Sequence, residues 1–247
     1  MTDFVVVIPA RYASVRLPGK PLRMIAGKPM IEHVFRRAME SNASSVVIAT
    51  DDDRIAKAAE EFGATVCMTG DHHRSGSERI AEVIDVLNWD DDQIVVNLQG
   101  DEPTMPAQLI NQCASLLDDH QADIATLASP IASVEDFENP NVVKVIVDDN
   151  GNAIYFSRAA IPFARTDELK TTAIKAAQHH HGIYAYRCGV LRRLVDAGPS
   201  ALEASEQLEQ LRALSLGMTI RVAQAAQQPG TGVDTEDDLV VVSTQLS

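Results

Sequence analysis

Residues 4–22 read FVVVIPARYASVRLPGKPL, and this stretch decides the fold class. It begins with the apolar, mostly β-branched run Phe4–Ile8, which is typical of a β-strand. The run passes into a loop rich in arginine, proline and glycine. In open α/β sheets, ligands bind beyond the carboxyl ends of the strands. The stretch therefore predicts a first strand followed by a loop at a ligand site.

Beyond this stretch, short apolar runs alternate with longer amphipathic segments. The predicted strands cover residues 46–49, 65–68 and 94–98, and two of the predicted helices cover residues 30–41 and 78–87. A further predicted helix is capped by Asp51 or Asp52 and ended by Gly63. The run at 94–98 is unusually apolar, as expected of a strand whose two faces are both covered. Strands that alternate with helices indicate right-handed crossovers and a parallel sheet through the N-terminal half.

The second half of the chain is less regular. Residues 142–147 and 153–156 flank Asp148-Asp-Asn-Gly151, a strong hairpin turn. The remaining predicted elements are strands at residues 182–186 and 219–223, a helix at 202–216, and a C-terminal helix opened by Asp234 or Thr235. We therefore predict an α/β protein with a central mixed, mainly parallel sheet. Its 247 residues suit a single domain, and no linker or internal repeat divides them.

The composition excludes several classes of protein. The formal net charge of -14 argues against a general nucleic-acid binder, because phosphate backbones are attracted by basic surfaces. It does not exclude a small phosphorylated ligand held by a local group of cations. Cys67, Cys113 and Cys188 lie far apart, so neither a disulfide framework nor a paired-thiol zinc site is predicted. The apolar run at 4–10 is too short to span a bilayer and has no basic flank, so we expect a cytoplasmic protein.

The loop after the first strand carries three cations within ten positions. Arg11, Arg16 and Lys20 are accompanied by Ser14 and Gly19, a set that suits a triphosphate. It is not a Walker A loop, because the G-x-x-x-x-G-K-[ST] spacing is absent and a proline follows the lysine. A surface loop with solvated charges is an equally good interpretation of the charge pattern alone.

Two further loops carry carboxylates. Asp101 follows the apolar strand at 94–98, next to Gly100, where a ligand can approach the backbone. A carboxylate there is a reasonable Mg²⁺ ligand, since Mg²⁺ takes only one or two carboxylates from a protein. Asp234 is a second candidate, but Asp234 or Thr235 is also a natural helix N-cap, and Thr235 with Asp238 resembles a capping box. The local pattern alone favours the cap.

Taken together, these segments resemble the CMP-Kdo synthetase family of nucleotidyltransferases, where Kdo is 3-deoxy-D-manno-octulosonate. The matching motifs run in the family's order from one end of the chain to the other. They are IPARYASVRLPGKPL (8–22), ATDD (49–52), HRSGSER (73–79), VNLQGDEP (96–103), NPNVVKV (139–145), YFSRAAIP (155–162), HHGIYAYR (180–187), LEQLR (208–212) and PGTGVDTEDDL (229–239). The resemblance implies a three-layer, glycosyltransferase-A-like nucleotidyltransferase fold.

The resemblance also implies roles for individual residues. CTP would be bound by Ala10, Arg11, Ser14, Arg16, Lys20, Arg74, Ser75, Gly76 and Gln99. Kdo would be bound by Arg158, His180, Tyr184, Glu209 and Gln210. Asp101 and Asp234 would bind Mg²⁺, and together with Arg11 and Lys20 would carry the catalysis. Within the run His179-His-His181, the family register directs His180 to the substrate, and the flanking pair is expected at the surface.

The implied reaction is in-line attack of the anomeric hydroxyl of Kdo on the α-phosphorus of CTP, which gives CMP-Kdo and pyrophosphate. The product would serve lipopolysaccharide or capsule synthesis. The resemblance further suggests a homodimer, with about residues 130–200 as a smaller sugar-binding and dimerisation subdomain. Two alternatives stay open: the same reaction with another sugar, such as 8-amino-Kdo or sialic acid, and a nucleotide sensor without activity.

Overall fold

The computed structural model describes residues 2–13 and 17–247 of the chain. In this part of the chain a single large sheet forms the centre, with the strand order β11-β7-β10-β6-β1-β4-β5 and the pair β8–β9 attached to β10. The strands of this sheet are β1 (Phe4–Ala10), β4 (Ser45–Thr50), β5 (Thr65–Met68), β6 (Ile94–Asn97), β7 (Ile124–Pro130), β8 (Lys144–Val147), β9 (Ala153–Ser157), β10 (Ala177–Arg187) and β11 (Ile220–Gln224). A separate small hairpin pairs β2 (Met24–Ile25) with β3 (Lys28–Pro29).

Helices connect most of these strands. They are α1 (Met30–Met39), α2 (Asp53–Glu61), α3 (Gly76–Val86), α4 (Ala107–Ser115), α5 (Val134–Glu138), α6 (Lys170–Ala176), α7 (Cys188–Asp196), α8 (Ala201–Glu206), α9 (Gln210–Ser215) and α10 (Glu236–Leu246), with short 3₁₀ turns η1 (Lys20–Leu22) and η2 (Asp167–Leu169).

The direction of the strands confirms the predicted sheet. β1 runs parallel to both β4 and β6, β4 runs parallel to β5, and β7 runs parallel to β11. β10 is antiparallel to β6, β7 and β8, so it joins the two parallel halves. The sheet is therefore mixed and mainly parallel, as the sequence predicts.

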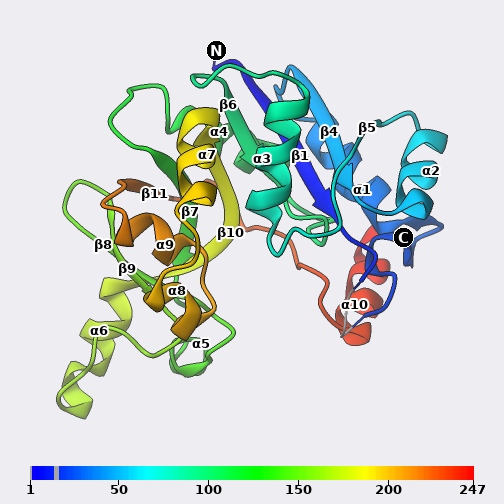
Figure 1. Ribbon diagram of the computed structural model, residues 1–247. Helices are drawn as coiled ribbons and strands as arrows, with labels where there is room; N and C mark the ends of the chain where they lie inside the picture. The colour runs from blue at the N-terminus through cyan, green and yellow to red at the C-terminus, as the bar shows by residue number, and fades with distance from the viewer. Residues whose placement is uncertain (1, 14–16) are drawn as a thin grey trace.

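The two faces of the sheet are covered by different helices, because successive strand residues point to opposite sides. Val6 and Ile8 of β1 pack in one cluster with residues of α1, α2 and α4. Val5 and Val7 pack in a second cluster with residues of α3, α7 and α9. Figure 1 shows α3 and α7 in front of the sheet and α1 behind it. The result is the predicted three-layer arrangement.

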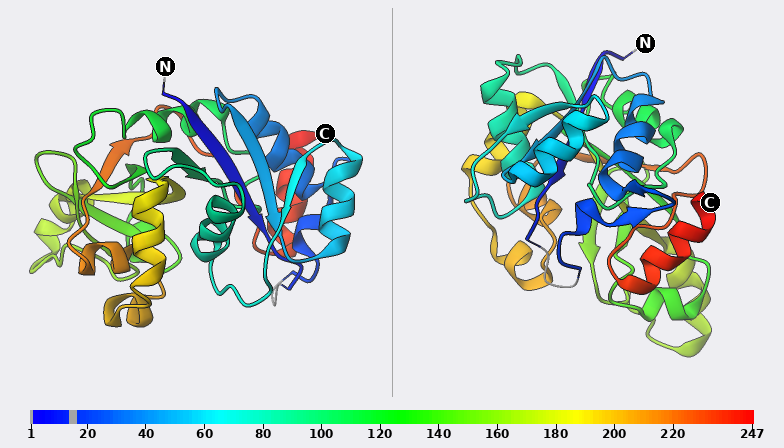
Figure 2. Two further views of the ribbon diagram at one scale, coloured as in Figure 1. Left: turned by 45° about the horizontal axis from the view of Figure 1, so that its top comes forward. Right: turned by 90° about the vertical axis from the view of Figure 1, so that its right-hand side faces the viewer.

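The C-terminal helix α10 returns to the beginning of the chain. Leu239 and Val242 of α10 are buried against Leu17, Ile25 and Met30, and the helix lies beside the first loop (Figure 2). Thr235 caps α10 in a capping box with Asp238, as its sequence predicts. This packing brings the loop that carries Asp234 to the loop that carries Lys20.

Two predicted elements differ from the structure. The helix predicted at residues 202–216 is interrupted, because Gln207 adopts a left-handed conformation with φ of 53° and separates α8 from α9. The strand predicted at 182–186 begins earlier in the structure, at Ala177. The sequence did not predict these additional residues, because the histidine run lacks the apolar alternation that marks a strand. The predicted hairpin around residues 148–151 is present as β8 and β9.

Candidate active site

A cavity of about 370 Å³ lies at the carboxyl ends of β1 and β6. Every described residue that the sequence assigns to CTP lines it: Ala10, Arg11, Lys20, Arg74, Ser75, Gly76 and Gln99. Asp101 and Asp234 line it as well. Ser14 and Arg16, also assigned to CTP, lie outside the described residues.

Close backbone packing holds the walls of this cavity together. A Cβ atom at Gly100 would lie 2.9 Å from the carbonyl oxygen of Pro9, so only glycine lets the loop after β6 approach the end of β1 this closely. The backbone N–H of Val233 donates to the carbonyl oxygen of Asp101 over 2.9 Å. The hydroxyl of Thr104 donates to the carbonyl oxygen of Thr231 over 3.1 Å. The two loops with the candidate metal ligands are thus fixed to each other.

Lys20 occupies the point at which the two carboxylates converge. Its Nζ lies 2.6 Å from Oδ2 of Asp101 and 2.9 Å from Oδ1 of Asp234. Burial lowers the pKa of Lys20, but Asp101 and then Asp234 more than offset this, so the pKa is raised and the ammonium stays charged. Arg11 is exposed and makes no ion pair with another described residue, so its guanidinium is available to a ligand.

The same carboxylates fit a Mg²⁺ ion. They already bracket one cation, the ammonium of Lys20, and both offer the hard oxygen ligands that Mg²⁺ prefers. Among the described residues no group of three or more potential ligands is arranged for a metal, and a Mg²⁺ site needs only one or two carboxylates when phosphates complete it. Burial, with Asp101 as the second cause, raises the pKa of the adjacent Glu102 to about 8. The third carboxyl therefore carries a proton near neutral pH.

Helix α3 brings Arg74, Ser75 and Gly76 to the cavity. The Ser75 side chain is the N-cap and accepts a hydrogen bond from the N–H of Glu78 over 3.2 Å. A Cβ atom at Gly76 would lie 3.1 Å from Cγ of Pro9, so a larger residue would press on the end of β1. The cap and the glycine together fix how the start of α3 faces the cavity.

A second, smaller cavity of about 70 Å³ adjoins the first, and Gln99 lines both. Its walls include Tyr184, Glu209 and Gln210, three of the five residues assigned to the sugar. Burial raises the pKa of the Glu209 carboxyl and raises that of Tyr184 well above its usual range. Oε1 of Glu209 is sealed and has no hydrogen-bond partner among the described residues, so it is an acceptor that awaits a donor.

His180 is buried and lines a third cavity rather than this one, although its ring is 5.3 Å from that of Tyr184. Burial, and secondarily the two neighbouring histidines, lower its pKa to about 3, so the imidazole is neutral. The hydroxyl of Thr126 donates to the carbonyl oxygen of Ile183 over 2.7 Å. Because a hydroxyl has only one proton, giving it to Ile183 requires Nε2 of His180, 3.0 Å away, to donate to Thr126 Oγ1, and Nδ1 is then the acceptor of this ring.

Arg158, which the resemblance assigns to the sugar, lines neither of the two cavities described above nor the third cavity described below. Its Nε donates to the carbonyl oxygen of Glu206 over 2.8 Å, and its Nη1 donates to that of Pro140 over 3.1 Å. Its guanidinium therefore holds the end of α8 against the loop before β8.

Two residues of the site, Asn97 and Arg79, were missed by sequence reasoning, whereas Ser77 belongs to the segment 74–77 that the resemblance assigns to the cytosine pocket. Asn97 is buried and accepts a hydrogen bond from Nε2 of Gln99 over 3.0 Å, which orients that amide; its signal is a polar residue in an otherwise apolar strand. Ser77 is buried on the wall of the second cavity, and Arg79 is buried on the wall of the first. Both lie in the motif HRSGSER, where a charged residue on the buried face of a helix is the available signal.

The prediction that His179 and His181 lie at the surface is wrong. Both are half-buried and line a third cavity of about 270 Å³, together with Glu102. Nε2 of His181 is 2.8 Å from the hydroxyl of Ser129. Both pair with β7, and His179 also pairs with Lys144 of β8, so this part of β10 lies inside the sheet rather than in an exposed loop.

Comparison with known proteins identifies the family. A cytidylyltransferase family model matches residues 5–220. The chain belongs to the cytidylyltransferase family. It is 53% identical, over 96% of its own length and 96% of the relative's, to a 3-deoxy-manno-octulosonate cytidylyltransferase of Yersinia enterocolitica serotype O:8 / biotype 1B.

Solved structures of cytidylyltransferases share the fold. A CMP:2-keto-3-deoxy-manno-octonic acid synthetase complexed with CTP superimposes with a TM-score of 0.90 at 41% identity, covering 99% of this chain and 98% of that one. A cytidylyltransferase from Leptospira borgpetersenii serovar Hardjo-bovis matches with a TM-score of 0.63 at 15% identity, over 99% of this chain and 86% of that one, which shows the fold alone. Within the described residues, no helix combines the length and apolar character needed to cross a bilayer.

Proposed function

We propose that this cytidylyltransferase transfers CMP from CTP to the anomeric hydroxyl of 3-deoxy-D-manno-octulosonate, giving CMP-Kdo and pyrophosphate. The observation that carries the proposal is the convergence of Lys20, Asp101 and Asp234 on the wall of a cavity that also holds Arg11 and the start of α3. The close relative from Yersinia enterocolitica, 53% identical, is a 3-deoxy-manno-octulosonate cytidylyltransferase, which supports Kdo as the acceptor.

The chemistry requires placement and charge neutralisation rather than a nucleophilic side chain. Asp101 and Asp234 would hold Mg²⁺, which supplies positive charge to the phosphates and lowers the pKa of a coordinated hydroxyl. With both carboxylates engaged in this way, the Lys20 ammonium is free to turn to the phosphates. Lys20 and Arg11 would then stabilise the negative charge that develops on the leaving pyrophosphate.

The acceptor would bind where the two cavities meet. Gln99 lines both cavities, and Asn97 fixes its amide, so Gln99 can contact a sugar whose anomeric hydroxyl faces the α-phosphate. Glu209 and the neutral His180 offer acceptors for the sugar hydroxyls. Arg158 would bind the acceptor's carboxylate only by exchanging its present carbonyl partners for it, since a guanidinium can grip a carboxylate with two hydrogen bonds.

We further infer that the protein acts in the cytoplasm as a homodimer and serves lipopolysaccharide or capsule synthesis, with residues 130–200 as its sugar-binding and dimerisation subdomain. The large apolar side chain of Phe163, 87% exposed in this segment, supports a subunit contact there. Sedimentation of the purified protein tests the dimer: a single monomeric species at micromolar concentration would refute it.

Pyrophosphate release tests the reaction. Purified protein is incubated with CTP and Mg²⁺ together with Kdo, 8-amino-Kdo, sialic acid or no sugar. We expect release only with Kdo, and only when Mg²⁺ is present. Preference for another sugar would move the proposal to a related acceptor. CTP binding without release for any sugar would instead indicate a nucleotide sensor.

A further inference from the structure

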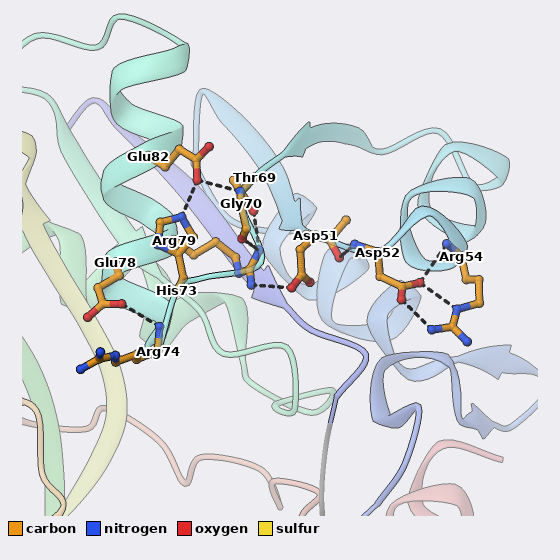
Figure 3. A network of polar contacts seen from close by, with 11 residues as sticks. Asp51, Asp52, Arg54, Thr69, Gly70, His73, Arg74, Glu78, Arg79 and Glu82 are labelled. Atoms are coloured by element: carbon orange, nitrogen blue, oxygen red, sulfur yellow. Dashed lines mark hydrogen bonds and ion pairs between the residues drawn. The ribbon is translucent and has the colours of Figure 1, made fainter.

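Arg79 is a charged residue in an unusual position. It lies in α3 and is only 3% exposed, yet it contributes to the wall of the large cavity. Figure 3 shows its guanidinium between Asp51, which follows β4, and Thr69 and Gly70, which follow β5. A buried guanidinium is costly unless its charge is paired and its donors are used.

Part of the guanidinium is accounted for within the protein. Nη1 donates to the hydroxyl of Thr69 and to the carbonyl oxygen of Gly70, the latter over 3.3 Å. Nη2 forms an ion pair with Oδ2 of Asp51 at 3.2 Å. These contacts neutralise the charge and fix the plane of the group.

Two N–H groups remain. Arginine has five donors, and the hydrogen bonds above use only those of Nη1, while Nη2 makes an ion pair with Asp51. In the described part of the chain Nε–H therefore has no partner, and Nη2 keeps at least one N–H without a hydrogen bond. Nε is also not among the sealed, unpartnered polar atoms of these residues, so it keeps accessible surface. Nε–H and Nη2–H lie side by side and can form a fork of two parallel donors.

The neighbouring polar groups of this wall are occupied by each other. His73 is bound through Nε2 to Glu82, which also accepts from the N–H of Gly70. The backbone N–H of Arg74 donates to Glu78. The guanidinium of Arg74 is exposed, so among the described residues of this wall Arg79 is the buried cation with donors to spare.

The place of Arg79 in the sheet distinguishes it from the phosphate-binding groups. Asp101 follows β6 on one side of β1, whereas Asp51, Thr69 and Gly70 follow β4 and β5 on the other side. With the phosphates at Lys20, Asp101 and Asp234, the opposite part of the cavity is left for the nucleoside.

On the proposed use of CTP, we propose that Arg79 is a specificity-determining residue that binds the pyrimidine edge and selects cytosine over uracil. Cytosine presents two adjacent acceptors, N3 and O2, which match a fork of two donors. Uracil carries a hydrogen on N3, so one of the two donors would face another donor. Such a mismatch leaves buried donors unpaired, which is the condition under which a site discriminates strongly. Asp51 is a positioning residue, because it orients the fork without touching the base.

The test is the ratio of CTP to UTP affinity, measured by calorimetry with Mg²⁺ and no acceptor, so that it does not depend on the sugar. Arg79→Gln replaces the fork by an amide, which offers one donor and one acceptor and thus fits uracil. We expect the preference for CTP to fall by about 10- to 100-fold. The double variant Asp51→Asn/Arg79→Gln removes the whole ion pair and guards against a folding defect. The matched control is Asp52→Asn/Arg54→Gln, which removes the exposed neighbouring pair and should leave the ratio unchanged.

The outcomes separate the possibilities. If folded Arg79→Gln protein loses affinity for CTP and UTP by the same factor, Arg79 binds phosphate or supports the fold, and the proposal is overturned. If both Arg79 variants keep the wild-type ratio, the base is read elsewhere. If the wild-type protein binds neither nucleotide, the proposed function itself fails, which is a different result from either.

Discussion

The side of the site proposed for the nucleotide (the nucleotide side) and the side proposed for the acceptor (the acceptor side) are built in different ways. The nucleotide side is a cavity of about 370 Å³ whose charged groups sit on loops at the carboxyl ends of strands. The acceptor side encloses about 70 Å³, and its walls include residues within β10 and at the start of α9. Small-molecule sites commonly measure about 300–1,000 Å³. The volume of the first side falls within this range, and that of the second lies below it.

The electrostatics of the two sides differ in the same sense. On the nucleotide side Lys20 stays charged because two carboxylates surround it. On the acceptor side burial raises the pKa values of Glu209 and Tyr184 and lowers that of His180, so burial there opposes the charged form of each group. Recognition of a highly charged triphosphate needs fixed charges, whereas recognition of sugar hydroxyls needs uncharged donors and acceptors. The comparison shows how one site can hold both kinds of group: the charged groups lie on loops at the strand ends, and the groups whose charge is opposed by burial lie within the core.

The largest effect is expected on the nucleotide side. Lys20→Ala should reduce kcat by ~10²-fold, about 3 kcal/mol, because it removes a preorganised cation from the transition state. Asp101→Asn should reduce kcat by at least the same factor, while its melting temperature should change little. Pyrophosphate release over a Mg²⁺ titration measures both. Near-normal turnover of folded Asp101→Asn at saturating Mg²⁺ would contradict the role of Asp101 as a metal ligand.

A smaller and selective effect is expected on the acceptor side. Glu209→Gln should raise KM for the sugar by about 10-fold, since it replaces an acceptor oxygen by a donor, and should leave CTP affinity within about 2-fold. Steady-state kinetics and CTP calorimetry separate the two. The exposed Glu61→Gln serves as a control. If Glu209→Gln weakened CTP binding by the same factor by which it raises KM for the sugar, the two sides of the site would not be independent.

The junction of the two sides depends on a close backbone approach. Gly100→Ala should destabilise the fold by about 1–3 kcal/mol, because its Cβ would lie 2.9 Å from the carbonyl oxygen of Pro9. Gly182→Ala is the matched control, since a Cβ there meets nothing within 4 Å. Urea denaturation of both variants measures the difference. Equal stabilities would show that the loop can move aside without cost.

The smallest effect concerns acid stability on the β10 side. Burial lowers the pKa of His181 from 6.5 to about 4, so the folded state resists a proton that the unfolded chain accepts. Stability is therefore fully present above pH 6.5 and declines as the pH falls towards 4. Wild type loses unfolding free energy between pH 8 and pH 5 because His181 resists protonation. His181→Gln should avoid at most about 2 kcal/mol of this loss at pH 5 and should gain nothing at pH 8. The exposed His72→Gln should recover nothing at either pH, and an unaltered pH slope in His181→Gln would contradict this prediction.

Much of the nucleotide side could be predicted from the sequence. The strand at 4–10 and the loops after it carry local signals: apolar β-branched runs, clustered cations and a carboxylate beside a glycine. Parallel strands then place those loops at one edge, so the topology follows from the order of elements. The choice between a cap and a metal ligand for Asp234 could not be made locally, because its position beside Lys20 depends on α10 packing against the first loop.

The acceptor side was harder to predict. The break at Gln207 has no glycine or proline to announce it, since an ordinary residue takes the left-handed conformation there. The burial of His179 and His181 arises because this part of β10 lies inside the sheet, which no local pattern indicates. The position of the Arg79 guanidinium likewise depends on its contacts with the loops after β4 and β5, which the pattern of its own helix does not indicate.

By itself the sequence determined the α/β class, the parallel first half, the positions of the charged loops and, through its ordered motifs, the family. Those properties depend on local periodicity and on residue types along the chain. Only the tertiary structure decided that Lys20 lies between Asp101 and Asp234, that Gln99 lines both cavities, and that Arg79 keeps two free donors. These facts depend on which buried groups are left without partners after packing, and that is fixed by contacts between segments far apart in the chain.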